Sequence, residues 1–496
     1  MVSQFDLIVI GSGPAGFCAA LEGSRRGLPT ALVESGAVGG TGMRTGAVPV
    51  KRLQHRCKSR IRSLDYLRRY HPGIADSLET GQITESAYAG GPELDKVMEE
   101  LHADLHRLEE SIEGRLRRAG ITLLRGEARF RSTRSVSVSG TEYRGRSFII
   151  ATGSRPDGYP GIGLDGNAFI SHRDLFAPTT TGTGTGTAEG PSGRLIVLGG
   201  DIEGIELAQA FAVFGAAVTV VEMESELLPG VDEDLKAPVL RRLAEEGVQV
   251  VTGRRAVSGG YREPEGSEKG KGNSAQGREA GVELDDGTVL SADAVLITGS
   301  RSLNFPDGLE AAGVEYGDGG VSVDSRLRCS VPGIFAAGEI TGRGGPANVA
   351  AVQGIAAAGE AAAYLTGSAT VPPAPVAPPA AIFTIPEIAG VGASEGDLQR
   401  TGRRYRVRRV ELSETWRGFA NSVSEGFVKI LLGEDDEILG CWWSAEDAAE
   451  IVSMHAISMG TAQAPLLDID AIRKAPYIHP TLSEAYRDIL LDNSIR

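Results

Sequence analysis

The stretch Asp6–Gly16, which reads DLIVIGSGPAG, decides the fold that we expect for this chain. Its first half is a short apolar run typical of a buried parallel strand, and its glycines open an Ala-rich segment with helical character. A further apolar run, Thr30–Glu34, ends in an acidic residue. A strand, a Gly-x-Gly-x-x-Gly turn, a helix and an acidic strand end, in this order, are typical of a dinucleotide-binding α/β unit.

The three glycines of this turn have separate physical tasks. Gly11 allows the tight turn, Gly13 lets the backbone approach a pyrophosphate, and Gly16 lets the helix pack on the strand. Glu34 can accept hydrogen bonds from ribose hydroxyls, and the helix N-terminus favours the negative phosphates. The sequence therefore predicts a bound dinucleotide cofactor in the N-terminal part of the chain.

Length and charge restrict the other possibilities. A chain of 496 residues is long enough for about two to four domains. The 65 acidic residues exceed the 50 basic ones, and no block of Lys and Arg occurs, which argues against nucleic acid or an anionic membrane as a partner. Apolar runs of about 18 residues and a signal-peptide pattern are absent, so we expect a cytoplasmic protein without a membrane span.

A second motif, Gly39–Lys51, reads GGTGMRTGAVPVK and resembles the sequence GGTCxNxGCxPSK. That sequence is the redox-disulfide motif of the FAD-dependent pyridine nucleotide-disulfide oxidoreductases, a family that includes dihydrolipoyl dehydrogenase, mercuric reductase and soluble transhydrogenase. Gly42 and Ala47 stand where the family carries its two redox-active cysteines. Thiol–disulfide exchange needs a thiolate, so the family's disulfide chemistry is excluded at these two positions.

The cysteines elsewhere offer little substitute. Cys18, Cys57, Cys329 and Cys441 form no C-x-x-C pair, and an isolated cysteine is usually a packed, unreactive thiol. Cys57 has an alternative interpretation as a relocated redox thiol, because it follows Lys51 within the helix expected after the motif.

The resemblance continues through motifs at 148–156, 195–199, 218–222, 332–339, 383–387 and 479–484, and covers the chain from about residue 5 to about residue 490. It implies an α/β fold with two Rossmann-like dinucleotide-binding domains, one for FAD and one for NAD, plus a C-terminal α+β dimerisation domain. The implied ranges are 1–155 and 300–368 for the FAD domain, 156–299 for the NAD(P)-binding-like domain, 369–381 for a linker and 382–496 for the dimerisation domain. Two Gly-, Ser- and Thr-rich segments, Thr179–Gly193 and Glu263–Ala280, are expected to be flexible surface insertions.

The resemblance also implies the site residues. Those expected to bind FAD are Gly11, Gly13, Gly16, Glu34, Gly40, Thr41, Lys51, Thr152, Gly153, Gly338 and Glu339. Those expected to bind NAD(P)H are Gly199, Gly204 and Glu222. The expected catalytic residues are an acid–base pair supplied by the partner subunit of a homodimer and an ion pair beside the flavin: His479 with Glu484, and Lys51 with Glu206. Glu339 replaces the family's Asp, and no metal site is expected.

The second glycine turn departs from the family pattern G-x-G-x-I-G-x-E. Asp201 replaces its second glycine, and Glu203 replaces an apolar residue beside the expected nicotinamide. A carboxylate facing a pyrophosphate is a like-charge contact, and Asp201 could itself occupy the anion site at the helix N-terminus. A harmless substitution is the alternative. Glu222 retains the ribose-binding acid and would favour NAD over NADP.

Three functions are compatible with these features. The first is an NAD(P)H-dependent reductase that passes electrons from flavin to a quinone-like or other small acceptor, or between nicotinamides as soluble transhydrogenase does. The second is a flavoenzyme reduced by an organic substrate, with a closed nicotinamide pocket and His479 as the base. The third is a non-catalytic, flavin-binding dimer.

Overall fold

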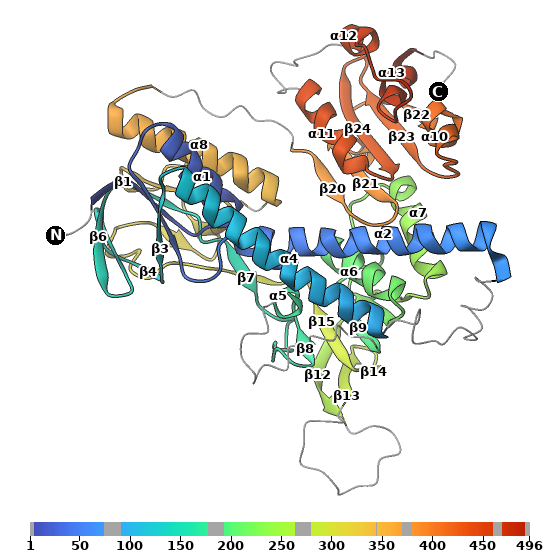
Figure 1. The fold of residues 1–496 in the computed structure, drawn as a ribbon, viewed down its shortest axis with the longest axis horizontal. Helices are drawn as coiled ribbons and strands as arrows, with labels where there is room; N and C mark the ends of the chain where they lie inside the picture. Colours follow the sequence, from blue (N-terminus) through green and yellow to red (C-terminus); the bar gives the residue numbers. More distant parts are fainter. Residues whose placement is uncertain are drawn as a thin grey trace, which may run out of the picture. The chain divides into compact units, whose positions relative to one another are not determined.

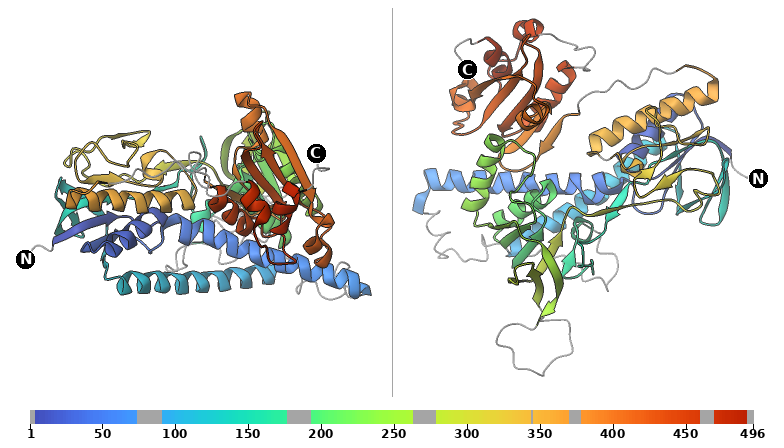
Figure 2. Two further views of the ribbon diagram at one scale, coloured as in Figure 1. Left: turned by 90° about the horizontal axis from the view of Figure 1, so that it is seen from above. Right: turned by 180° about the vertical axis from the view of Figure 1, so that it is seen from behind.

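The computed structural model describes residues 4–73, 91–176, 193–262, 279–343, 345–369, 378–459 and 469–491. The chain forms two compact units, each built from three stretches of sequence. The first unit contains residues 1–53, 91–190 and 294–373, and the second contains residues 54–90, 191–293 and 374–496. Figure 1 labels their elements, and Figure 2 gives two further views. Most of the two predicted insertions and of the predicted linker lies outside the described residues. Glu279 and Ala280, expected at the end of the second insertion, instead begin a strand, β13 (Glu279–Leu284), and Ala280 is buried there.

The first unit contains a seven-stranded sheet. Its parallel strands, in spatial order, are β3 (Thr122–Arg125), β2 (Thr30–Glu34), β1 (Gln4–Ile10), β6 (Thr141–Ile150) and β19 (Ile334–Ala336). Two antiparallel strands, β5 (Ser135–Val138) and β4 (Ala128–Ser132), extend the sheet beyond β6. Because β1 lies between two parallel neighbours, Leu7–Ile10 is buried, as the apolar run in the sequence predicts.

Three helices accompany this sheet: α1 (Pro14–Arg25), α4 (Gly91–Arg118) and α8 (Ala347–Thr366). Helices α1 and α8 pack closely enough to require glycine at Gly354, where a Cβ would lie 2.0 Å from the carbonyl oxygen of Ala15. Apolar residues of all three helices share one core with β1, including Val9, Ile112 and Ala358. The helix expected after the first glycine turn is therefore present.

Short elements complete the first unit. The motif Gly39–Lys51, called the missing-sulfur motif below because Gly42 and Ala47 replace the family's cysteines, contains a π-helix, η1 (Thr41–Thr45). It runs into α2 (Ala47–Tyr70), whose residues from Gln54 on belong to the second unit. The remaining elements are β7 (Ser154–Pro156) paired with β16 (Arg301–Leu303), β8 (Phe169–Ile170) paired with β15 (Ala294–Ile297), β17 (Tyr316–Gly317) paired with β18 (Gly320–Val321), α5 (His172–Leu175) and η3 (Glu339–Thr341). The pairing of β7 with β16 brings residues 154–156 and 301–303 together.

The second unit repeats the strand, glycine turn, helix and strand arrangement of the first. Strands β9 (Arg194–Leu198), β10 (Ala217–Glu222) and β11 (Gln249–Thr252) are parallel, with α6 (Ile202–Val213) between β9 and β10 and α7 (Glu233–Glu245) between β10 and β11. An antiparallel sheet of β12 (Ala256–Arg262), β13 (Glu279–Leu284) and β14 (Val289–Ala292) follows. The predicted second dinucleotide-binding topology is present.

The C-terminal part of the second unit is an antiparallel sheet with helices. The strand order is β20 (Ala380–Ile382), β21 (Glu387–Gly392), β24 (Ile438–Ala445), β23 (Phe427–Leu432) and β22 (Arg406–Glu411). The helical elements are α9 (Glu395–Thr401), η4 (Leu412–Glu414), α10 (Trp416–Ala420), α11 (Ala448–Met459), α12 (Ile469–Lys474) and α13 (Glu484–Leu491). Trp443 is fully buried in its core. Among the described helices, none is both long and apolar enough to cross a membrane.

Candidate functional site

The first glycine turn has the geometry that a pyrophosphate site requires. Gly11 has a φ of +97°, and a Cβ there would lie 2.4 Å from the carbonyl oxygen of Ala151. A Cβ at Gly16 would lie 1.8 Å from the carbonyl oxygen of Gly11, so neither position can carry a side chain. A Cβ at Gly13 would meet no protein atom within 4 Å. The space at the N-terminus of α1 is therefore open at the one position where a ligand is expected to approach.

Glu34 is held at the end of β2 by hydrogen bonds from the turn. Its Oε2 accepts from the Ser12 amide at 3.0 Å and from the Ser12 hydroxyl at 2.6 Å, and its Oε1 accepts from the Gly36 amide at 2.7 Å. The buried Ser12 hydroxyl in turn accepts from the Gly39 amide at 3.0 Å. Sequence reasoning missed Ser12, which connects the glycine turn, the acidic residue and the missing-sulfur motif.

The missing-sulfur motif is wound tightly against the start of α1. The Gly46 amide donates to the Thr41 carbonyl at 2.7 Å, which closes the π-helical turn. Gly40 has a φ of +57°, and a Cβ there would lie 2.7 Å from Cα of Gly13. Within this motif the structure places Gly40 beside the first glycine turn, and cofactor binding by Gly40 and Thr41 stays a prediction.

The four cysteines form no disulfide with one another in the structure. Cys57 is fully buried, and its Sγ lies 3.7 Å from the carbonyl oxygen of Ala210 in α6. Burial raises the pKa of the Cys441 thiol to about 12 and that of Cys329 to about 12 as well. A buried thiol is a poor nucleophile, which weakens the alternative interpretation of Cys57.

Thr152, Gly153 and Glu339 meet in the first unit. Gly153 has a φ of +62°, and a Cβ there would lie 4.0 Å from Oε2 of Glu339. The hydroxyl oxygen of Thr152 is buried and has no hydrogen-bond partner among the described residues. Gly338, with a φ of +82°, holds the preceding backbone through its amide, which donates to Oε1 of Gln353 at 2.8 Å. The backbone of Gly153 thus lies near the Glu339 carboxylate, and the neighbouring Thr152 has a buried hydroxyl oxygen without a protein partner among the described residues.

The second glycine turn contains Asp201 without backbone strain. Asp201 has φ −83° and ψ −176°, close to the −61° and −179° of Gly13 at the matching helix start. Its Oδ1 accepts from the Ile202 amide at 2.7 Å, so the carboxylate caps α6. The substitution is therefore harmless for the backbone, yet it puts a negative charge where the first turn leaves space.

Glu222 is engaged much as Glu34 is. Its Oε2 accepts from the Gly200 amide at 2.5 Å, and its Oε1 accepts from the Glu224 amide at 2.8 Å. Gly199 has a φ of +117°, and Gly204 is buried in the first turn of α6. The predicted nucleotide-binding residues Gly199, Gly204 and Glu222 are thus brought together in the second unit.

Lys51 lies in α2 of the first unit, and Glu206 lies in α6 of the second. Glu206 is buried, and its Oε1 accepts from the Phe383 amide at 2.8 Å, at the start of the C-terminal part. Its carbonyl oxygen accepts from Gln54 Nε2 at 2.5 Å. Glu206 therefore also has a structural task within its unit, and the ion pair with Lys51 stays a prediction.

His479 and Glu484 form the predicted pair. Nδ1 of His479 lies 3.1 Å from Oε1 of Glu484, while the Thr481 amide donates to Oε2 at 2.9 Å. Burial alone would raise the pKa of Glu484, but the hydrogen bonds from Thr481 and His479 leave that pKa below its ordinary value. The His479 side chain is 62% exposed and has Trp416 beside it, edge to face, with ring centroids 6.2 Å apart. A buried, ionised carboxylate thus orients an accessible imidazole, which suits proton transfer.

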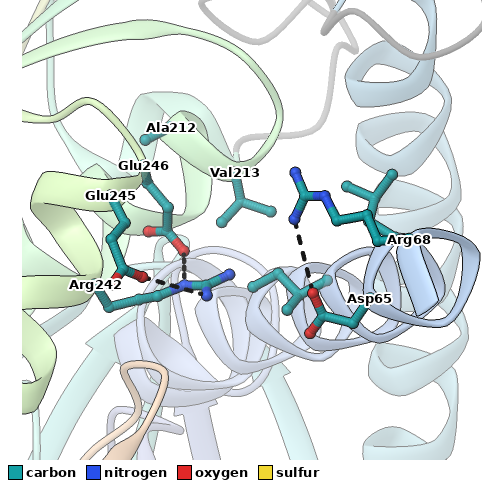
Figure 3. A pocket seen from close by; sticks show the side chains of 9 residues that line it. Asp65, Arg68, Ala212, Val213, Arg242, Glu245 and Glu246 are labelled. Atoms are coloured by element: carbon teal, nitrogen blue, oxygen red, sulfur yellow. Dashed lines mark hydrogen bonds and ion pairs between the residues drawn. The ribbon is translucent and has the colours of Figure 1, made fainter. Parts of the chain in front are cut away.

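Described residues of the second unit line two cavities. One, of about 240 Å³, is lined by residues of α2, α6 and α7 and their ends, and Figure 3 shows its charged side chains. Arg242 Nε lies 2.7 Å from Glu246 Oε1, and Arg68 Nη1 lies 3.7 Å from Asp65 Oδ1. The charged side chains that line this cavity therefore form ion pairs with one another. The other, of about 320 Å³, is lined by residues that include Ile478 and Thr481, beside His479.

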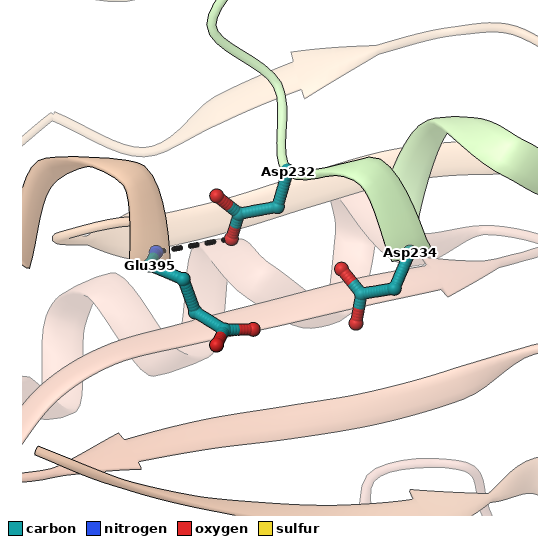
Figure 4. Close-up of side chains that lie close together, drawn as sticks. All are labelled: Asp232, Asp234 and Glu395. Carbon is teal, nitrogen blue, oxygen red and sulfur yellow. Dashed lines mark hydrogen bonds between the residues drawn. The ribbon is translucent and has the colours of Figure 1, made fainter. Parts of the chain in front are cut away.

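Three carboxylates of the second unit come close together in Figure 4: Asp232, Asp234 and Glu395. The ammonium of Lys429, which is fully buried, lies 2.9, 2.7 and 2.7 Å from them. Burial alone would lower the pKa of Lys429, but the three carboxylates raise it. The cation in this cluster is therefore a lysine side chain, which ties β23 to α7 and α9.

Comparisons with known proteins agree with this architecture. Residues 5–354 match the pyridine nucleotide-disulphide oxidoreductase family, and residues 378–489 match the dimerisation domain of that family. A dihydrolipoyl dehydrogenase of Thermus scotoductus is 32% identical over 97% of this chain and 96% of its own length.

Two solved structures share the fold. LpdA from Mycobacterium tuberculosis has a TM-score of 0.79 at 23% identity and covers 99% of both chains. The HOCl-induced flavoprotein disulfide reductase RclA from Escherichia coli has a TM-score of 0.77 at 22% identity, covering 98% of this chain and 99% of its own. The predicted fold class is confirmed, and the chain belongs to the pyridine nucleotide-disulphide oxidoreductase family, whose members typically bind FAD.

Proposed function

We propose that this protein is an FAD-dependent oxidoreductase that moves electrons between flavin and a small molecule that is not a disulfide. The observation that carries the proposal is an intact cofactor cradle beside a motif without sulfur. Gly11, Gly13 and Glu34 keep the geometry of the cradle, whereas Gly42 and Ala47 cannot form a thiolate.

The residues present fit FAD. The open space at Gly13 suits the pyrophosphate, and Glu34 suits the ribose hydroxyls. The unsatisfied Thr152 hydroxyl and the Glu339 carboxylate suit a polar cofactor chain. When bound, FAD supplies hydride and electron transfer chemistry, which no amino-acid side chain of this site provides.

The His479–Glu484 pair would move the proton that accompanies electron transfer. The ionised Glu484 fixes the imidazole through Nδ1, and Nε2 remains to give or take a proton. Lys51 and Glu206, if paired as the family resemblance implies, would place a cation beside the flavin.

The electron donor divides the proposal into two forms. In the first, NAD(P)H reduces the flavin, and a quinone-like acceptor or another nicotinamide accepts the electrons. In the second, an organic substrate reduces the flavin, and the capping carboxylate of Asp201 keeps nicotinamide out. We favour the second form because Asp201 has the backbone of Gly13 but not its free space. A non-catalytic flavin-binding dimer is the third candidate, and the ordered His479–Glu484 pair argues against it.

The protein would act as a cytoplasmic homodimer on a small-molecule substrate. The C-terminal domain that matches the family's dimerisation domain supports this assembly. Large apolar side chains of that domain support it as well: Phe419 is 83% exposed, and Ile478, the residue before His479, is 80% exposed. Burying them in a subunit interface would remove this apolar surface from water.

Anaerobic titration of the purified protein tests the proposal. We expect yellow protein that contains FAD, little bleaching by micromolar NADH or NADPH, and no reduction of lipoamide. A colourless protein that takes up no added FAD would refute the proposal, and turnover of lipoamide would refute the exclusion of disulfide chemistry. Rapid bleaching by NADH would make the first form the leading one.

A further inference from the structure

Arg301, Ser154 and Glu339 form a chain of polar contacts within the first unit. Arg301 Nε donates to the Ser154 hydroxyl at 2.7 Å, and that hydroxyl donates to Oε2 of Glu339 at 2.5 Å. Arg301 Nη2 also donates to the Ser154 carbonyl oxygen at 3.3 Å. Because a guanidinium can only donate, the single proton of the Ser154 hydroxyl must point to Glu339. The direction of this relay is therefore fixed.

The two ends of the relay are fixed to each other by backbone. Strands β7 and β16 pair antiparallel, with Ser154 opposite Leu303 and Pro156 opposite Arg301. After β16, the Asn304 amide donates to the Gly153 carbonyl at 2.9 Å, and its side chain donates to the Thr152 carbonyl at 3.1 Å. Ser154 is buried, so its hydroxyl has little freedom to turn elsewhere.

The two oxygens of Glu339 differ in their surroundings. Oε2 receives the Ser154 proton, whereas Oε1 receives no hydrogen bond from the described residues and lies 3.7 Å from Arg301 Nε. At this distance the two groups form an ion pair, but the contact is too long for a hydrogen bond. The Glu339 side chain is 35% exposed. A Cβ built on Gly153 would lie 4.0 Å from Oε2 of Glu339, and Thr152, the residue before Gly153, has the hydroxyl group without a partner among the described residues.

We propose that Arg301 and Ser154 are positioning residues for the cofactor: they fix one oxygen of Glu339, the acid that the family resemblance places against the ribityl chain of FAD, and leave the other oxygen as the acceptor. This inference rests on the proposed function. A carboxylate can only accept hydrogen bonds and a ribityl hydroxyl can donate one, so the chemistry of the two groups is complementary.

The length of the side chain explains why a relay is needed. Glu339 has one more methylene group and one more rotatable bond than an aspartate at the same position. A free glutamate would lose more rotamer entropy on binding the cofactor than a shorter acid would. The relay orders Glu339 before the cofactor arrives, and pre-ordering strengthens binding.

Titration of the apoprotein with FAD, followed by flavin fluorescence, measures this effect. We expect Arg301→Met and Ser154→Ala each to weaken FAD binding about tenfold, as loss of a charge-assisted hydrogen bond does. The matched control is Arg155→Met, because Arg155 lies in β7 next to Ser154 but donates to Asn304 Oδ1, at 2.9 Å, and not to Ser154. It should change FAD binding less than about twofold. Arg301→Lys should restore part of the loss, since Lys keeps the charge.

A double-mutant cycle with Glu339→Asp separates positioning from folding. The shorter acid cannot reach the Ser154 proton, so Arg301→Met should cost nothing further in that background. Equal FAD affinity in Arg301→Met and Arg155→Met, or additive losses in the cycle, would overturn the inference while the proposed function stands. Failure of the wild-type protein to bind FAD would instead refute the proposed function itself.

Discussion

Replacing Asp201 with glycine is the most informative single perturbation of this protein. The φ and ψ of Asp201 match those of Gly13, so glycine fits the backbone without strain. The helix loses one capping bond, from the Ile202 amide at 2.7 Å. Replacing a capping side chain by glycine costs only a few tenths of a kcal/mol, so the variant should fold. Any change in nucleotide binding can then be attributed to the removed carboxylate.

The expected gain follows from Coulomb's law. A carboxylate and a phosphate charge about 4 Å apart repel by about 1 kcal/mol in water and by about 4 kcal/mol near a protein surface. Asp201 is exposed, so we expect the lower part of that range, about 1 to 3 kcal/mol. This corresponds to a roughly 5- to 150-fold lower Kd for NADH in Asp201→Gly.

The rate and extent of anaerobic flavin reduction, measured against NADH concentration, give the assay. Asp201→Asn is the matched variant, because asparagine keeps the size and the capping ability and removes the charge. If NADH reduces the flavin of Asp201→Asn, the charge of the carboxylate is the barrier to NADH binding. If NADH reduces only the flavin of Asp201→Gly, the size of the side chain is the barrier. NADPH should gain less than NADH, since Glu222 disfavours a 2′-phosphate.

Wild-type protein that is bleached rapidly by micromolar NADH, with no change in Asp201→Gly, would refute this reasoning. The turn would then tolerate a carboxylate beside the pyrophosphate. Salt provides a further check, because a repulsion between exposed charges should weaken as ionic strength rises.

Three further predictions concern sulfur, a buried cation and a buried acid. Reduction should give no thiolate-to-flavin charge-transfer band, and a long-wavelength band lost in Cys57→Ser would show a relocated thiol. Lys429→Met should lower the free energy of unfolding by about 3–5 kcal/mol because three carboxylates lose their cation, whereas Arg241→Met, which removes an exposed pair, should cost under about 1 kcal/mol in the same urea titration. The pKa of Glu484 in the folded protein lies below its ordinary value of 4.5. The ionised side chain therefore stabilises the folded state above about pH 4.5, and this contribution is lost as the pH falls through the lowered pKa. Glu484→Gln should flatten stability below about pH 5, and an unchanged curve would contradict this.

Local patterns were sufficient to predict the elements that carry the cofactor cradle. The apolar run before Gly11 and the acidic ends at Glu34 and Glu222 predict parallel strands, because a strand buried on both faces has no polar alternation. The same patterns could not predict contacts between distant segments. Ser154 and Arg301 are 147 positions apart and meet only through the pairing of β7 with β16.

Lys429 shows the same limit for a charge. In the sequence it is one lysine in an apolar strand, GFVKILL, which is typical of an exposed edge or an interrupted core. Its half-buried partners come from α7 with its N-cap and from α9, and no spacing rule connects them. Ser12, in contrast, lies inside the glycine turn, and a rule that asks what orients the acid at the end of β2 would have found it.

The lost disulfide is a matter of backbone placement as well as composition. A Cβ at Gly42 would lie 2.8 Å from Cγ of Pro14 and 3.6 Å from Cβ of Ala347, so a cysteine there requires a shift of the π-helical turn or of α1. Ala47, at the first position of α2, already carries a Cβ. Restoring sulfur by Gly42→Cys and Ala47→Cys therefore has to move the turn beside Gly13 that the cofactor is expected to use. This coupling between the motif and the cradle favours direct transfer from the cofactor to its substrate over any route through a thiol.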